Sequence, residues 1–291
     1  MNDYEREQIE KERGYMVVKS NDLVLKSRYQ YSVYQQKTIA YICSLIKPSE
    51  NDKKEEYQLD YEFEIAEYLQ LLGVESSGKQ YALVKETLQS LSNKSMWIPI
   101  KDENGEGEVL VRWLSNVAVY KKSGKVKIKL DSYLAPYLFN LKERYLSYGL
   151  INILNFDSKY SIRLYELLKA QYNLKRSQYG HRRTDTPTVE WIIELDELRH
   201  LLMLDVETVD ENGETIPPKL TRFPDFRRKV LEIAQKEINE LSDIKFFFEP
   251  IKKGKKVVKL RFMIMQKDNI ERLVSQVKNR ELLAGTEEKE N

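Results

Sequence analysis

The chain has 291 residues, 41% of them hydrophobic and 32% charged, with a formal net charge of +2. A chain of this length suggests about two domains, and no apolar run approaches the roughly 20 residues that a bilayer span requires. Residues 1–15 are charged and lack an apolar signal core, so we expect a cytoplasmic protein without a membrane partner. The net charge by itself is too small to indicate a nucleic-acid partner.

Charge is distributed unevenly along the chain. Basic residues gather in 175–183 and 219–259, whereas acidic residues gather in 102–108, 205–214 and 287–290. A field polarised in this way suits one anionic partner.

The first half of the chain predicts two neighbouring helices after an extended start. Residues 17–25 look extended, and residues 32–45 have the apolar spacing of a helix. A charged linker at 48–56 and a strand at 55–61 lead to the pair of helices at 63–72 and 79–92. Gly73 is placed to end the first helix of this pair in a left-handed conformation.

Strands follow these helices. A hairpin is predicted from 95–101 and 109–114 around the acidic turn DENGEGE, and strands at 116–120 and 125–130 are expected to extend the same sheet. The order helix, turn, helix, hairpin is typical of a winged helix. The pentapeptide DENGE occurs again at residue 210, which we interpret as coincidence because that copy lies in a long loop between helices.

The second half repeats this order in unlike sequence. A helix is predicted at 158–171, a strand at 189–195 and a helix at 196–203. Residues 222–264 then predict a basic amphipathic helix and two strands joined by a lysine-rich turn. We place the boundary between the two halves near 152–156.

The amphipathic helix, Pro224 to Leu241, is the predicted reading element. Pro224 suits a first helical position. The predicted core stripe is Phe226, Val230, Ile233, Ala234 and Leu241, with basic and amide side chains toward the other side. A helix of this kind fits the major groove of DNA, and a cationic loop beside it can hold the flanking phosphates.

Each of these features also has a simpler interpretation. A charged helix face is usually only solvated, and lysine-rich turns protect sheet edges from aggregation. The turn 252–256 alone therefore does not distinguish the two interpretations. An arginine-rich helix start next to it favours nucleic-acid binding.

Several segments together resemble the theta-type, iteron-binding plasmid replication initiators, the Rep proteins. They are VVKSNDLVLKSRYQYSVYQQKTIAYICSLI, FDSKYSIRLYELLKAQ, WIIELDELRHLL and FPDFRRKVLEIAQKEINELSDIKFFFE, within residues 16–265. The resemblance implies two winged helices that bind directly repeated double-stranded sites at a plasmid origin, open the adjacent DNA and help to recruit host initiator and helicase proteins. It also implies a homodimer in equilibrium with a monomer, in which the dimer represses the initiator's own promoter.

On this basis we expect an α+β fold with two tandem winged-helix domains. The expected parts are a flexible segment 1–15, an N-terminal domain 16–152 for dimerisation and secondary DNA contact, a C-terminal domain 153–270 for the main DNA contact, and a helical to disordered acidic tail 271–291. The expected DNA-binding residues are Lys79, Gln80, Lys85, Lys219, Arg222, Arg227, Arg228, Lys229, Gln235, Lys252, Lys253, Lys255 and Lys256. Glu86 lies near the face of the N-terminal helix that should meet DNA, so we expect this helix to read few bases. The loop inserted between Met203 and Phe223 separates the two helices of the C-terminal motif, unlike the short turn of a helix-turn-helix.

No catalytic, cofactor or metal site is predicted. Residues 73–80, GVESSGKQ, nearly match a phosphate-binding loop, but Gln80 replaces the hydroxyl residue and a helix precedes the loop where a strand is required. With only His181 and His200, a histidine-held metal for a tyrosine nuclease is unsupported. The single Cys43 is interpreted as a core residue.

Two alternatives remain open on the sequence. A winged-helix transcriptional regulator would share every DNA-binding feature but would have no need to melt DNA, whereas a nicking nuclease would need a nucleophile that the pattern does not reveal. The strands at 109–114 and 116–120 are apolar enough to form a dimer interface, but they are equally compatible with covering by the domain's own helices.

Overall fold

The structure, a computed structural model, describes residues 14–46, 57–139, 141, 145–178, 187–209 and 215–289. The predicted linker 48–56 and His181 lie outside these residues, as does nearly all of the segment 1–15. Within the described ranges, no helix is both long and apolar enough to cross a bilayer.

The N-terminal half contains one winged helix. Its elements are α3 (Val33–Ser44), β2 (Asp60–Glu64), α4 (Ile65–Leu71), α5 (Gly78–Asn93), β5 (Leu114–Val119) and β6 (Lys125–Leu130). Ser32 and Gln35 form a reciprocal capping box that fixes the start of α3. Gly73, at φ +66°, ends the α4 segment as predicted. The predicted helices are confirmed, and the order of the sheet is β2-β6-β5.

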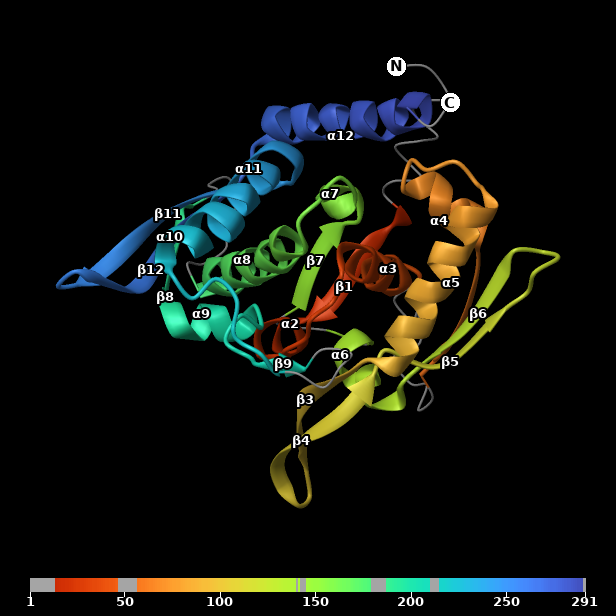
Figure 1. Cartoon of the computed structure of the whole chain (residues 1–291), viewed down its shortest axis with the longest axis horizontal. Helices are drawn as coiled ribbons and strands as arrows, with labels where there is room; N and C mark the ends of the chain where they lie inside the picture. Colours follow the sequence, from red (N-terminus) through yellow and green to blue (C-terminus); the bar gives the residue numbers. More distant parts are fainter. Residues whose placement is uncertain are drawn as a thin grey trace.

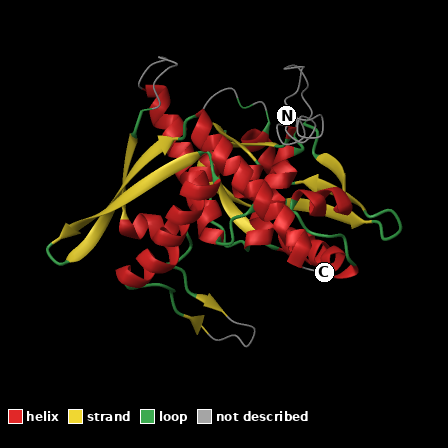
Figure 2. Ribbon diagram, turned by 90° about the horizontal axis from the view of Figure 1, so that it is seen from above, coloured by secondary structure: helices red, strands yellow, loops and turns green. Residues whose placement is uncertain are grey.

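The C-terminal half repeats this topology. Its elements are α8 (Lys159–Gln178), β8 (Val189–Glu194), α9 (Leu195–Leu201), α10 (Phe223–Phe226), η2 (Arg227–Leu231), α11 (Glu232–Leu241), β11 (Ile244–Lys253) and β12 (Lys256–Gln266). The order of its sheet is β11-β12-β8, so β11, β12 and β8 occupy the positions of β5, β6 and β2 in the N-terminal sheet. Figures 1 and 2 show the β11–β12 and β5–β6 hairpins projecting from opposite ends of the long axis.

The predicted extension of one N-terminal sheet is wrong. β3 (Ser95–Asp102) and β4 (Gly105–Arg112) form a separate two-stranded sheet around the acidic turn, whereas β6 pairs with β2 on one side and with β5 on the other. Alternation in β6 places Val126, Ile128 and Leu130 in the core. The β3–β4 hairpin, which projects at the bottom of Figure 1, is thus an insertion into the winged helix.

Two short strands lie on either side of the second copy of DENGE in the sequence. β9 (Thr208–Val209) pairs antiparallel with β10 (Thr215–Ile216), although residues 210–214 themselves lie outside the described part. The long loop expected between the helices thus contains two short strands, β9 and β10.

The N-terminal extended segment is shorter than predicted. β1 (Met16–Ser20) pairs with β7 (Tyr145–Gly149), and the chain then turns into α2 (Asn21–Lys26). The side chain of Ser20 accepts a hydrogen bond from the Leu23 amide and so starts this helix within the segment expected to be extended. Three short helices, η1 (Ser132–Leu134), α6 (Ala135–Leu138) and α7 (Ile151–Leu154), flank β7.

Helix α8 joins the two halves into one core. It contacts α2, α3 and β7 on one side and α11, β8 and β12 on the other. Lys19 of β1 and Glu166 of α8 form a buried ion pair at 2.6 Å, and Tyr148 of β7 donates to the same carboxylate. The buried apolar residues of both halves therefore form a single cluster around this helix.

The segment predicted as a tail is a long helix. α12 (Asn269–Lys289) lies across the molecule at the top of Figure 1 and contacts α7 and α11. The backbone of Leu283 lies so close to Gly73 that a Cβ added there would be 2.7 Å from its carbonyl oxygen. Through this contact the C-terminal helix is anchored on the N-terminal domain.

Candidate nucleic-acid interface

The reading helix begins after Arg222 and runs through α10, a π-helical turn and α11. Pro224 occupies the first turn, as predicted, and Asp225 complements the positive end of the helix dipole. Phe226, Val230 and Ala234 are fully buried, but Ile233, predicted in the core, is 41% exposed. The π turn inserts an extra residue into the helical period, so Leu231 and Ile238 enter the core instead.

The arginines of the helix start are exposed and paired with carboxylates of the same element. Arg227 lies 2.8 Å from Glu232, whereas Arg228 and Arg222 lie 3.4 Å and 4.0 Å from Asp225. Exposed pairs of this kind contribute little to stability, so a DNA phosphate or base can replace the carboxylate at low cost. Lys229 is exposed beside them.

Gln235 has a different position from the one expected. Its amide donates to the carbonyl of Phe246 at 3.0 Å, and Asn239 makes two further bonds to the backbone of the same residue. In the free protein Gln235 therefore attaches the helix to β11 and does not project from the exposed face.

The lysine-rich turn forms the tip of the β11–β12 hairpin. Gly254, at φ +62°, supplies the left-handed residue of the turn. The lysines beside it, Lys252, Lys253, Lys255 and Lys256, are exposed, and none forms an ion pair with a carboxylate of the described residues. Their positive charges are thus available to an external anion.

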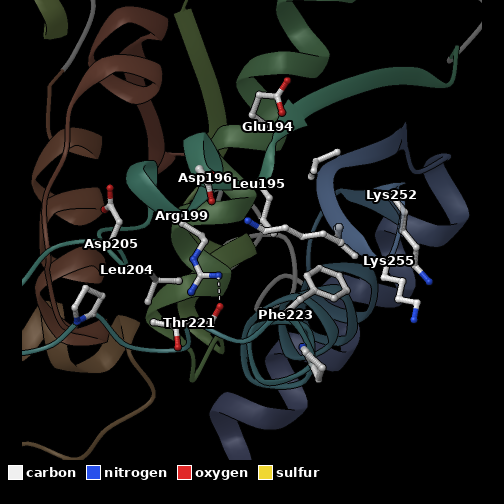
Figure 3. Close-up of a pocket in the computed structure, with 15 residues that line it drawn as sticks. Glu194, Leu195, Asp196, Arg199, Leu204, Asp205, Thr221, Phe223, Lys252 and Lys255 are labelled. Carbon is white, nitrogen blue, oxygen red and sulfur yellow. Dashed lines mark hydrogen bonds between the residues drawn. The ribbon is translucent and has the colours of Figure 1, made fainter.

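The wing and the reading helix share one cleft. Figure 3 shows Lys252 and Lys255 on one wall and Phe223, at the start of the helix, close to them. The cleft encloses about 740 Å³, and Arg199 of α9 fixes its opposite wall by donating to the carbonyl of Thr221 at 2.9 Å. The structure therefore brings the helix start and the wing together. Lys219 is exposed in the segment that leads into this helix.

The N-terminal reading helix is a weaker candidate. Lys79 and Lys85 are exposed on α5, as is Glu86 between their faces. Ser77 caps the helix by accepting from the amide of Gln80, whose side-chain oxygen is buried without a partner among the described residues. These residues lie far along the chain from the C-terminal set, on the other winged helix.

The sequence analysis did not identify the wing of the N-terminal domain. The β5–β6 turn carries Lys121 and Lys122, both exposed, and Lys125 and Lys127 continue the exposed face of β6. Glu62 of β2 pairs with Lys125 at 3.0 Å and with Lys127 at 3.2 Å. The basic run KKSGKVKIKL, residues 121–130, indicates this wing. The sequence analysis had instead assigned the wing to the preceding hairpin, 95–101 and 109–114.

Two models of one protein family match the chain. The model described as "Initiator Replication protein, WH1" covers residues 16–169, and "Initiator Rep protein, WH2" covers residues 194–264. The chain belongs to this family of replication initiators. The predicted resemblance and the α+β fold with two winged helices are confirmed, and the interpretation as a transcriptional regulator is not favoured.

Relatives of known function agree with this assignment. A replication initiation protein of Escherichia coli is 26% identical over 268 residues, which cover 92% of this initiator and 74% of the relative. The PI protein of Escherichia coli is 30% identical over 175 residues, and these span about half of each chain, 58% and 53%. The crystal structure of the Pi initiator protein in complex with iteron DNA matches with a TM-score of 0.66 at 21% identity, covering 88% of this chain and 99% of that one.

The histidine, the cysteine and the glycine-rich segment considered for other chemistry have structural surroundings. The described residues contain no group of three or more His, Cys, Asp or Glu side chains that could hold a metal ion. His200 bonds Asp205 through Nδ1 at 2.6 Å and Arg28 through Nε2, so its ring joins α9 to the N-terminal domain. Cys43 is fully buried, and burial raises the pKa of its thiol to about 12. The segment GVESSGKQ follows helix α4, unlike a phosphate-binding loop.

Proposed function

We propose that this initiator binds directly repeated duplex sites, iterons, at its plasmid origin and uses both winged helices to do so. The observation that carries the proposal is the repeated topology, with one lysine-bearing wing at each end of the molecule. The relative with a similar fold that was crystallised with iteron DNA supports it. Contacts with base edges give specificity, and contacts with phosphates give most of the affinity. In this proposal the helix therefore supplies the specificity and the wing supplies affinity.

The C-terminal winged helix is the main DNA-binding module in this proposal. Arg228 and Lys229 read the major groove at the start of the helix, while Lys253 and Lys255 hold the phosphates beside it. The N-terminal winged helix adds Lys79, Lys85 and the wing residues Lys121 and Lys122. In the cytoplasm, the bound initiator opens the adjacent AT-rich DNA and recruits the host initiator and helicase, which supply the catalysis.

Footprinting on the DNA that flanks the coding region tests this function. We expect protection of several direct repeats and permanganate reactivity in a neighbouring AT-rich tract when host factors are added. A single protected operator that stays unmelted with host factors present would contradict the proposal. Nicking of a supercoiled origin plasmid in divalent metal would contradict the absence of catalysis.

The β3–β4 hairpin is the proposed dimer contact, and the dimer represses the initiator's own promoter. Trp97 and Leu110 face each other across the two strands and are 49% and 52% exposed. The outer edge of β4 has no strand partner among the described residues, so a second copy can extend the sheet. Light scattering should show a lower dimer fraction for Leu110→Ser than for Tyr133→Ser, an exposed control outside the hairpin.

A further inference from the structure

The segment that leads into the C-terminal reading helix contains a strained turn. Leu220 has a φ of +56°, a left-handed conformation that residues other than glycine rarely adopt. Such a conformation persists only where the surrounding structure holds it. Lys219 and Arg222, both exposed, lie on either side of this turn. The shape of the turn therefore affects where these two cations, and the helix that follows them, are placed.

The guanidinium of Arg199 holds the turn. It donates one hydrogen bond to the carbonyl of Thr221 at 2.9 Å (Figure 3) and another to the carbonyl of Leu220. The same guanidinium lies over the ring of Phe226, 5.6 Å from the ring centre. One side chain thus contacts both the segment before the helix and the first turn of the helix itself.

The burial of Arg199 makes these contacts specific. Its exposed fraction is only 8%, and it has no carboxylate partner among the described residues. A buried charge is costly unless it is hydrogen-bonded, and the planar guanidinium can hold two acceptors at once. Because its hydrogen bonds go to the two carbonyls of the turn, the guanidinium and the turn fix each other in place.

Arg199 also connects the start of the reading helix to the sheet that carries the wing. It belongs to α9, which contacts β8 and the wing strand β12. The far end of the reading helix is attached to β11 by Gln235 and Asn239. The π turn, Arg227–Leu231, lies between these two attachments. Helices bend at π turns, so the attachment to β11 alone does not determine the direction of the helix start.

We propose that Arg199 is a positioning residue for sequence recognition, which sets the start of the reading helix relative to the wing. This inference rests on the proposed function and extends it to a residue that does not itself touch DNA. The hydrogen bonds of Arg228 and Lys229 to base edges require accurate geometry, whereas a wing lysine acts on a phosphate as a point charge. Loss of Arg199 therefore reduces the preference for the cognate sequence more than it reduces general affinity for DNA.

Arg199→Lys tests this role, with affinities measured on the footprinted duplex and on a random duplex of equal length. Lysine keeps the charge but lacks the planar fork that holds both carbonyls. The ratio of the two affinities should fall about tenfold, the size of one lost base contact. The slope of log K against log salt concentration should stay at its wild-type value, because no phosphate contact is removed. Missing-base interference should weaken opposite the helix start and stay unchanged elsewhere.

Arg163 offers a matched control. It is 4% exposed, donates to the carbonyl of Ser27 at 2.8 Å and lies over the ring of Tyr29 at 4.7 Å, so it makes the same kinds of contact away from the reading helix. Arg163→Lys should lower the midpoint of urea denaturation as Arg199→Lys does, but should keep the wild-type affinity ratio. An equal fall of the ratio in both variants would overturn the positioning role, since any loosening of the core would then have the same effect.

A second pair of variants tests the turn with Arg199 intact. Leu220→Ile keeps the side-chain volume, but a β-branched residue is strongly disfavoured in the left-handed conformation, so the affinity ratio should fall. Asparagine tolerates this conformation, so Leu220→Asn should keep the ratio. If Arg199→Lys does not fold, this pair decides the question, and a wild-type ratio in Leu220→Ile overturns the inference.

Two results with folded Arg199→Lys would also overturn the positioning role. One is an unchanged affinity ratio. The other is an unchanged ratio with a salt slope lowered by about 1, which would mean that Arg199 contacts a phosphate. Both results would leave the proposed function intact. A wild-type protein that does not prefer the repeated sites to random DNA would instead overturn the proposed function, and this inference with it.

Discussion

Arg228 is an exposed cation near the start of the reading helix, and only a weak surface ion pair holds it. Replacing it with Ala should cost about 1–3 kcal/mol of binding free energy on the cognate duplex and less on random DNA. The free energy of unfolding should stay nearly unchanged, because no buried contact is lost. Parallel titrations on the two duplexes measure the difference. Equal losses on both would remove Arg228 from the residues that read bases.

Gly73 is constrained twice, by its left-handed backbone and by the neighbouring backbone of Leu283. Gly73→Ala should therefore lower the free energy of unfolding by at least about 1–3 kcal/mol in urea denaturation. Gly254→Ala is the matched control, because Gly254 has a similar φ of +62° but open space around it. A loss at Gly73 no larger than that at Gly254 would show that contact with α12 contributes nothing.

The two wings are elements of the same kind, and their lysines should behave alike. Lys253→Gln/Lys255→Gln should weaken binding to every duplex equally and reduce the salt slope by about 1 per lysine in contact with phosphate. Lys121→Gln/Lys122→Gln should do the same if the N-terminal wing also touches DNA. Filter binding over a range of salt concentrations measures both. A sequence-dependent loss for either pair would mean that the wing contacts bases.

The junction of β12 and α12 contains a buried lysine that couples folding to pH. Lys267 donates to the carbonyl of Ser242 at 2.8 Å and to Ser275 Oγ at 2.7 Å, and burial lowers its pKa from 10.5 to about 8. Between these pH values the unfolded chain keeps a proton that the folded chain has lost. The free energy of unfolding should therefore rise with pH across this window, relative to Lys267→Met. Parallel profiles in urea denaturation would contradict the assignment.

Helices and turns of this protein were largely predictable, whereas strand partners were not. Apolar spacing located α3, α5 and the reading helix, and Gly73 was correctly assigned as a left-handed cap. The partner of a strand depends on contacts distant in sequence, so β5–β6 was wrongly attached to β3–β4. The exposure of Ile233 was not predicted, because a helical pattern read from the sequence assumes a constant period and does not reveal a π turn.

At the scale of the whole molecule, the buried pair Lys19–Glu166 connects β1 to α8. Glu166→Leu alone leaves the ammonium of Lys19 buried without its partner and should cost about 3–5 kcal/mol of stability. The double variant Lys19→Met/Glu166→Leu should recover much of that loss, because neither charge remains. Urea denaturation of the three proteins measures it. A double variant as unstable as the single one would mean that packing around α8, not charge, dominates.

The sequence predicted two modules but not how they are joined. The expected boundary near 152–156 stays a prediction, since α8 follows it immediately and contacts both sides. The DNA-binding residues of each module could be proposed from local charge patterns. The contacts of α8 with both modules could not, because only the folded chain brings these elements together.

The pairing of β1 with β7 also determines the order of events on the ribosome. Lys19 is synthesised 147 positions before Glu166, and the first strand cannot complete its ladder until Gly149 has left the exit tunnel. Contacts between residues so far apart in sequence slow folding. Segments that are synthesised first keep their apolar faces exposed until their partners are made. The nascent N-terminal domain therefore remains incomplete until β7 and α8 have been synthesised.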